Sequence, residues 1–219
     1  MSVGCAPPAI YNILIPTIPH RHAQLCELLA ELDRQWQPGV GVLVYRDNLQ
    51  ASLREKNQVL LESSLADYVS WLDDDDWLAP GYLFEVMQSL ARNPDYVGFE
   101  VEWTIDGVPQ LPVEHSLRHA GWLNAEDRLT RDITALNPLR RKLALLGRWT
   151  DFPRDHGADK HWASQVAASG ECRTEAFVSR PMYFYRFRTE DSFLLPRQPA
   201  TEIPALPAYP WLTVIKDAA

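Results

Sequence analysis

The sequence predicts an α/β protein in which a mainly parallel sheet is flanked by helices. Three observations support this prediction. Short apolar runs at residues 10–16, 40–45 and 68–72 have the length and composition of buried strands. Apolar residues at helical spacing follow each run. Strands that alternate with helices are joined by right-handed crossovers, which makes the sheet mainly parallel.

Strands and helices alternate in the first half of the chain. Pro16 to Pro19 turn the chain after the first strand, and Asn93-Pro94 stops the third helix. In chain order we expect a strand at 10–16, a helix through 25–32, a strand at 40–45, a helix through 53–61, a strand at 68–72 and a helix from Pro80 to Leu90.

The pattern changes in the second half. Residues 96–105 alternate between polar and apolar, and Asp106-Gly107 is typical of a hairpin turn, which predicts a small antiparallel element. A helix is expected over 139–146, and another after the sequence 156–159. A late strand is expected at 177–185.

Length and composition indicate a cytoplasmic, soluble protein. We expect a single domain over 1–192 and, because prolines preclude a helix, an extended strap over 193–219. Cys5, Cys26 and Cys172 are widely spaced and odd in number, as in proteins with reduced thiols. No run approaches the roughly 18 apolar residues of a membrane span. The net charge of -8 argues against a broad non-specific grip on nucleic acid.

Four consecutive carboxylates, Asp73 to Asp76, follow the third strand. Two carboxylates about 4 Å apart repel each other by roughly 4 kcal/mol at an effective dielectric near 20, so the run needs a cation. Mg²⁺ and Mn²⁺ prefer such hard oxygen ligands and often share them with substrate phosphates. The alternative is a solvated acidic turn. Large apolar neighbours such as Trp71 and Trp77 argue against that alternative, because they bury the backbone.

The polar residues at the strand ends form an ordered series of motifs. Pro16-Thr17 ends the first strand, and Arg21 follows it. Asp47 ends the second strand, and Lys56-Asn57 lies in the next helix. This series, which ends in the Asp73–Asp76 run, resembles the motifs of family 2 glycosyltransferases with the GT-A fold, a Rossmann-like nucleotide-sugar-binding fold. In that family, Asp-x-Asp followed by Asp (the DXD motif) binds the metal.

The resemblance continues downstream and covers roughly residues 10–192. The family has Gly-Glu-Asp at the start of a helix, where this chain has Gly157-Ala158-Asp159. A later Tyr-Tyr-Arg element is similar to residues 183–186, but the His often found two residues beyond that Arg is Arg188 here. The Glu is therefore lost while the Asp stays, and a third protein ligand for the metal is in doubt.

The resemblance implies an inverting transfer of a hexose from a nucleoside diphosphate sugar, expected to be a UDP-sugar, to an acceptor hydroxyl. It implies Mn²⁺ or Mg²⁺ as cofactor, held by Asp75 or Asp76. His156 and His161 flank Asp159, and either could replace the missing metal His or orient the acceptor; the alternative is a structural or exposed histidine. The resemblance also implies that Asp159 is the catalytic base. The alternative for Asp159 is a structural role near the start of a helix.

The other expected site residues bind the nucleoside and the diphosphate of the donor. Asp73 is expected to face the ribose or a metal-bound water. The alternative for Lys56, Arg186 and Arg188 is that they are ordinary surface cations. The complete expected donor set is Thr17, Arg21, Asp47, Lys56, Asn57, Asp73, Asp74, Arg186 and Arg188.

The acceptor is left open between a glycan, a small molecule and a hydroxylated base in DNA. Trp103, Trp122, Trp149 and Trp162 lie in the half where the family binds its acceptor, and aromatic faces stack on sugars or bases. Arg and Lys residues concentrate over 140–154, where a flipped nucleotide could be held. The alternatives are core tryptophans and a solvated basic helix face.

Two other functions fit parts of the sequence. A non-catalytic nucleotide-sugar-binding module would explain Ala158 in place of Glu and the absence of the late His. A magnesium-dependent phosphotransferase built on Asp-x-Asp uses the first Asp as nucleophile, but its motif continues with Thr or Val where Trp77 stands, and its acidic strand is normally the first. Metal-dependent turnover of a sugar nucleotide separates the three.

Overall fold

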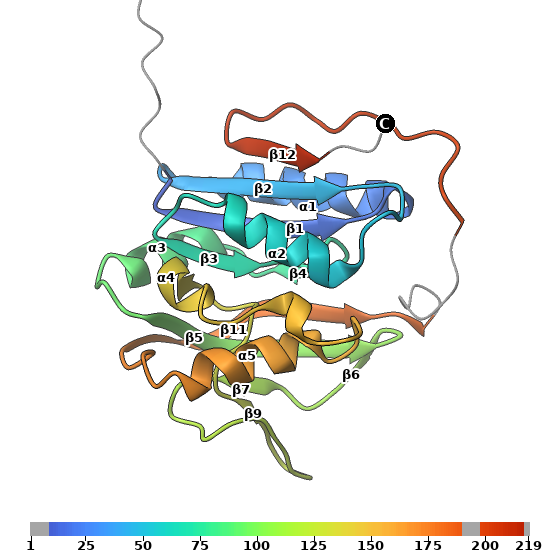
Figure 1. Ribbon diagram of the computed structural model, residues 1–219. Helices are drawn as coiled ribbons and strands as arrows, with labels where there is room; N and C mark the ends of the chain where they lie inside the picture. The colour runs from blue at the N-terminus through green and yellow to red at the C-terminus, as the bar shows by residue number, and fades with distance from the viewer. Residues whose placement is uncertain (1–8, 190–197, 217–219) are drawn as a thin grey trace, which may run out of the picture.

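The computed structural model describes residues 9–189 and 198–216, and twelve strands within them form one sheet (Figure 1). Its parallel core consists of β1 (Tyr11–Thr17), β2 (Val40–Arg46) and β3 (Tyr68–Trp71), with β1 in the middle. β12 (Leu212–Lys216) adds to β2, also in parallel. The parallel core predicted from the three apolar runs is confirmed.

The second half of the sheet is mixed. β5 (Tyr96–Ile105) pairs in parallel with β11 (Glu175–Phe187) and antiparallel with β7 (Val113–His115). The expected hairpin is present, because Asp106 and Gly107 both have positive φ between β5 and β6. The short remaining strands are β4 (Trp77–Leu78), β6 (Val108–Pro109), β8 (Leu123–Asn124), β9 (Leu129–Arg131) and β10 (Leu139–Arg140).

Helices cover both faces of the sheet. In Figure 1, α2, α4 and α5 lie in front of it, and α1 and α3 lie behind. Each helix turns its apolar stripe toward the sheet; in α1, for example, Leu25 and Leu29 are fully buried. The helices are α1 (His22–Gln35), α2 (Leu53–Ser63), α3 (Tyr82–Leu90), α4 (Arg141–Ala144) and α5 (Ala158–Ala168), with 3-10 turns η1 (Pro19–Arg21) and η2 (Trp149–Asp151).

The expected helix over 139–146 is wrong at its start. Leu139 and Arg140 form β10, which bridges β3 and β5 through Leu139. Leu139 is completely buried, so strand pairing overrides the helical spacing of this segment. The helix expected from Pro80 begins only at Tyr82, after Gly81.

The C-terminal segment joins the sheet. Residues 198–211 contain no helix, and the side-chain amide of Asn48 both donates to and accepts from the backbone of Ala200. Arg46 donates to the carbonyl of Pro204. Residues 193–197 and 217–219 of the expected strap, like residues 190–192 of the expected domain and Cys5, lie outside the described residues. Within the described residues, no helix has the length and apolarity to cross a membrane.

Candidate functional site

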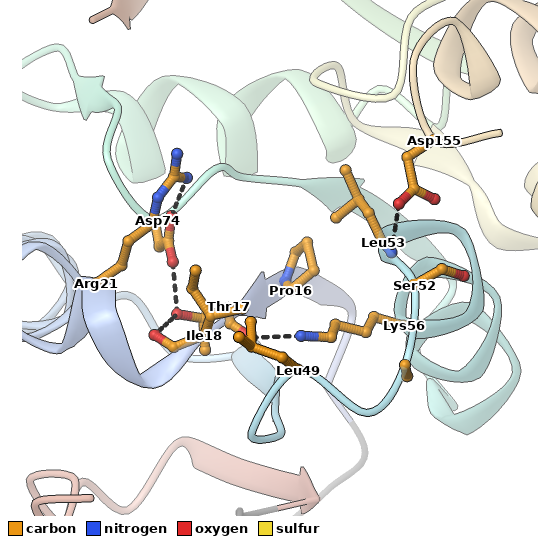
Figure 2. A pocket seen from close by; sticks show the side chains of 11 residues that line it. Pro16, Thr17, Ile18, Arg21, Leu49, Ser52, Leu53, Lys56, Asp74 and Asp155 are labelled. Atoms are coloured by element: carbon orange, nitrogen blue, oxygen red, sulfur yellow. Dashed lines mark hydrogen bonds and ion pairs between the residues drawn. The ribbon is translucent and has the colours of Figure 1, made fainter. Parts of the chain in front are cut away.

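The carboxyl ends of β1, β2 and β3 meet at one edge of the sheet, and this edge carries the acidic run. Asp74 is buried there and accepts hydrogen bonds from Oγ1 of Thr17 (2.5 Å) and Nη1 of Arg21 (2.8 Å) (Figure 2). The same Arg21 nitrogen lies 3.0 Å from Asp75. Burial raises the pKa of Asp74, and the neighbouring Arg21 opposes that rise. Three predicted donor-binding residues, Thr17, Arg21 and Asp74, are thus brought together beside Asp75.

Asp76 anchors the acidic run to β11. Its Oδ2 accepts a hydrogen bond from the Tyr183 hydroxyl at 2.6 Å, and its Oδ1 accepts one from the backbone N–H of Arg186 at 2.7 Å. Burial raises the pKa of Asp76 well above its usual range, and repulsion by Asp73 adds to the rise. Each oxygen accepts one hydrogen bond from the protein, and each keeps a second lone pair that a metal could use.

Asp73 and Asp75 are partly exposed, whereas Asp74 and Asp76 are buried. Burial raises the pKa of Asp73 to about 7, and repulsion by Asp75 and then Asp74 adds to this shift. The side chain of Asp75 is 13% exposed, against 2% for Asp74. Such crowded carboxylates fit a hard divalent cation that takes its other ligands from phosphates and water.

The expected metal set of Asp75, Asp76 and His156 is not brought together. Across residues 9–189 and 198–216, no three His, Cys, Asp or Glu side chains are grouped closely enough to hold a metal ion. His156 instead lines a cavity together with Asp73.

A first cavity of about 340 Å³ opens between β1 and the start of α2. Lys56 is buried beside it and donates to the carbonyl of Thr17 at 2.8 Å (Figure 2). The Lys56 ammonium also lies 2.6 Å from Oδ1 of Asp47. Asp47 is fully buried and also accepts from the backbone of Ala51 at 2.5 Å. Asp47 does not line the cavity itself, but it pairs with Lys56, which does. The lining residues are Pro16, Thr17, Ile18, Arg21, Leu49, Ala51, Ser52, Leu53, Lys56, Asp74 and Asp155.

A second cavity of about 570 Å³ contains the expected base. Asp159 lines it from the first turn of α5. This helix begins directly after Gly157, whose φ of +83° suits glycine. Asp73 lines the same cavity, and repulsion by Asp159 contributes to the raised pKa of Asp73. Leu53 and Asp155 line both cavities, which therefore share a wall.

The opposite side of the second cavity is apolar and aromatic. β5, β7 and β9 contribute Val101, Val113 and Leu129, and Trp122 lies under the cations of Arg131 and Lys160, 4.9 and 5.9 Å from its ring centre. Such a wall suits the face of a ring. Trp103 and Trp149 also line this cavity, whereas Trp162 is fully buried and belongs to the core.

Three buried polar atoms of residues that line the second cavity have no hydrogen-bond partner among the described residues. They are Oδ1 of Asn57 and the indole nitrogens of Trp71 and Trp149. Buried polar groups are normally hydrogen-bonded, and an unsatisfied one costs about 1–3 kcal/mol.

His115 also lines the second cavity. Its Nδ1 lies 2.7 Å from Oδ1 of Asn137, whose amide nitrogen donates to Val97. Nδ1 therefore carries the proton, since the amide oxygen accepts. Burial lowers the pKa of His115 to about 4, so the ring is neutral at pH 7.

Of the remaining expected residues, Arg186 contacts the acidic run. The guanidinium of Arg186 stacks over Trp77 at 5.4 Å and donates to the carbonyl of Asp76. Arg188 follows β11 and lines neither cavity. Sequence reasoning missed Asp155 and Trp71 as cavity residues. No local signal marks Asp155, because its contacts are with α2, about 100 residues earlier.

The fold is similar to solved structures of S. aureus TarS. TarS 1-349 in complex with UDP-GlcNAc matches with a TM-score of 0.61 and 15% identity, over 84% of this chain and 61% of that one. TarS 1-349 with UDP gives 0.58 and 16%, over 83% and 61%, and a longer TarS structure gives 0.56 and 13%, over 80% and 36%.

At this identity the likeness shows the fold alone, and it confirms the predicted fold class. The chain spans about three fifths of the length of TarS 1-349. No family model matches the sequence, and no curated protein does.

Proposed function

We propose that this chain, a protein with the GT-A fold, is a metal-dependent glycosyltransferase that moves a sugar from a UDP-sugar to an acceptor hydroxyl. The observation that carries the proposal is the pair of cavities with a shared wall. One is lined by Thr17 at the end of β1 and by Lys56 of α2, and the other is lined by Asp73 and Asp159. The TarS structures with UDP and UDP-GlcNAc, which share the fold, support this donor.

The nucleoside occupies the first cavity in this proposal, and the sugar reaches into the second. Arg21 and Lys56 supply positive charge near the diphosphate, although both also hold carboxylates of the protein. Asp75 holds Mn²⁺ or Mg²⁺, and Asp73 faces the ribose or a metal-bound water. The ion, when bound, stabilises the charge that grows on the leaving diphosphate.

Asp159 acts as the base. It accepts the proton of the acceptor hydroxyl while that oxygen bonds to the anomeric carbon and the bond from this carbon to the diphosphate breaks. Attack from the face opposite the diphosphate inverts the configuration. The support is positional: Asp159 lines the same cavity as Asp73, which lies at the head of the acidic run.

The acceptor is a glycan, a small molecule or a hydroxylated base in DNA. Each has a ring that can lie against the wall formed by Val101, Val113 and Trp122. We place the protein in the cytoplasm, where thiols stay reduced, because Cys26 and Cys172 are free.

The test is the release of nucleoside diphosphate from a panel of UDP-, GDP-, ADP- and TDP-sugars, with Mn²⁺, with Mg²⁺ and with chelator. We expect slow release from UDP-sugars, because water can replace the acceptor, and we expect chelator and Asp75→Ala to abolish it. Metal-dependent binding of UDP without any release would favour the non-catalytic module. Release that is unaffected by chelator would contradict the metal assignment.

A further inference from the structure

The wall between the two cavities is held by a contact between Asp155 and the start of α2. The Asp155 carboxylate accepts hydrogen bonds from the backbone N–H groups of Leu53 (3.3 Å) and Arg54 (3.2 Å). It also accepts one from Nε of Arg54 at 3.1 Å, and Nη1 of Arg54 donates to the carbonyl of Phe152. Arg54 therefore fastens both ends of the segment 152–155 to α2.

This contact joins the two parts of the chain that carry the site. α2 brings Lys56 to the first cavity, and the segment that contains Asp155 leads into α5, which brings Asp159 to the second. Figure 2 shows the Asp155 carboxylate facing the backbone nitrogen of Leu53 across the shared wall. A shift of this segment would move Asp159 relative to the donor.

α2 does not need Asp155 in order to begin. Ser52 and Glu55 form a complete capping box, and Leu60 is buried in the core. The segment before α5 depends more on the contact, because the carbonyl of Asp155 also accepts the N–H of Ala158, the first residue of α5, at 3.1 Å. Loss of the Asp155 contact should thus disturb the start of α5 more than α2.

We propose that Asp155 is a positioning residue that, together with Arg54, fixes the start of α5 so that Asp159 stays in reach of the acceptor. This inference rests on the proposed function. A half-exposed ion pair adds little stability, so the contact acts through geometry. A displacement of about 1 Å at a reacting group can lower a rate about 100-fold.

The test uses Asp155→Asn and Arg54→Leu, with Asp151→Asn as the matched control. Asp151 is a carboxylate of the neighbouring turn η2, lines neither cavity and has a side chain that is 49% exposed. UDP with Mn²⁺ is titrated by calorimetry, and UDP release from a hydrolysed UDP-sugar gives kcat and KM.

We expect both variants to keep the UDP affinity within about 3-fold and the unfolding temperature of the wild type, and to lower kcat at least about 10-fold. The double variant should be no slower than the slower single variant, because the two side chains act as one unit. Asp151→Asn should match the wild type in every measurement.

Each other outcome overturns the inference. A wild type that neither binds UDP nor releases it removes the proposed function as well, and one that binds without release has no base for Asp155 to position. If the wild type is active and Asp155→Asn is equally active, the inference about Asp155 is overturned while the proposed function stands. Equal losses of affinity and kcat with a lower unfolding temperature indicate a structural role. Tighter UDP binding with faster release indicates that the carboxylate obstructs the diphosphate.

Discussion

The four carboxylates of the acidic run differ in their surroundings although their side chains are identical. Asp74 is held by Thr17 and Arg21, and Asp76 by Tyr183 and the backbone of β11. Those two shape the loop. Asp73 and Asp75 are left to face the cavity and the solvent, respectively, which is where a substrate and its metal would approach.

Replacing Asp159 by Asn should separate binding from catalysis. We expect UDP affinity to stay within about 2-fold, while donor hydrolysis falls about 100- to 10,000-fold, because general base catalysis typically contributes that much. Calorimetry and steady-state release of UDP measure the two quantities. Asp127→Asn, in an exposed turn, is the control for the loss of one negative charge. An Asp159→Asn variant with normal turnover would remove Asp159 as the base.

His115 should make the protein sensitive to acid. Its pKa is about 4 in the folded protein, because burial disfavours the charged ring, against about 6.5 in the unfolded chain. As the pH falls, His115 therefore binds a proton in the unfolded state at a higher pH than in the folded state. The free energy of unfolding should be unaffected by His115 above pH 6.5 and should fall by up to about 3 kcal/mol as the pH drops from 6.5 to 4.

Urea unfolding of wild type and His115→Gln at pH 7.5 and 4.5 measures this effect. The variant should lose less stability between the two pH values than the wild type does. His20→Gln, on the surface, should lose as much as the wild type. Parallel pH dependence of wild type and His115→Gln would show that another group is responsible.

Residues at strand ends could be predicted from the sequence, and residues that meet only through the tertiary fold could not. Thr17 and Asp74 follow buried strands, so their meeting at the sheet edge follows from parallel pairing. Asp155 gives no such signal, since its partners Leu53 and Arg54 belong to another helix. The likeness of Asp73 and Asp76 in sequence also hides their different environments.

At the scale of elements, α2 is the helix on which both cavities depend. Its N-terminus is fixed by Ser52, whose hydroxyl accepts from the backbone of Glu55 while the Glu55 carboxylate accepts from the backbone of Ser52. Lys56 and Asn57 lie one turn further on. The capping box thus sets where these two side chains stand.

Replacing Ser52 by Ala should lower the free energy of unfolding by about 1 kcal/mol, the usual effect of losing such a cap. Urea unfolding measures the change. Ser164→Ala, in the middle of α5, is the control and should be neutral or slightly stabilising, because Ser164 bonds back to the carbonyl of Lys160. Equal stability of Ser52→Ala and wild type would mean that Asp155 alone suffices to hold the start of α2.

The elements with strong local periodicity could be predicted, and those decided by pairing could not. The strands β1, β2 and β3 were expected within one residue of their observed bounds, and the helix through Leu25 to Leu32 was expected within three. Leu139 was expected in a helix, but it pairs with both β3 and β5 and so lies in the sheet between them. No feature of the local sequence predicts this pairing with two distant strands.

At the scale of the whole molecule, the site lies where the two halves of the sheet meet. The parallel core supplies Thr17, Lys56 and the acidic run, and the mixed half supplies the apolar wall with Val101 and Val113. α5 supplies Asp159 to the second cavity, and Asp155 lies in the wall that this cavity shares with the first. The order of motifs along the chain predicted the first part, whereas the shared wall depends on contacts between distant segments.

The most direct test of this account is the structure of the protein with Mn²⁺ and a non-hydrolysable UDP-sugar analogue. The account predicts the nucleoside in the cavity beside Lys56, the metal at Asp75, and the sugar in the second cavity between Asp73 and Asp159. A nucleotide bound elsewhere, or a sugar directed away from Asp159, would contradict it.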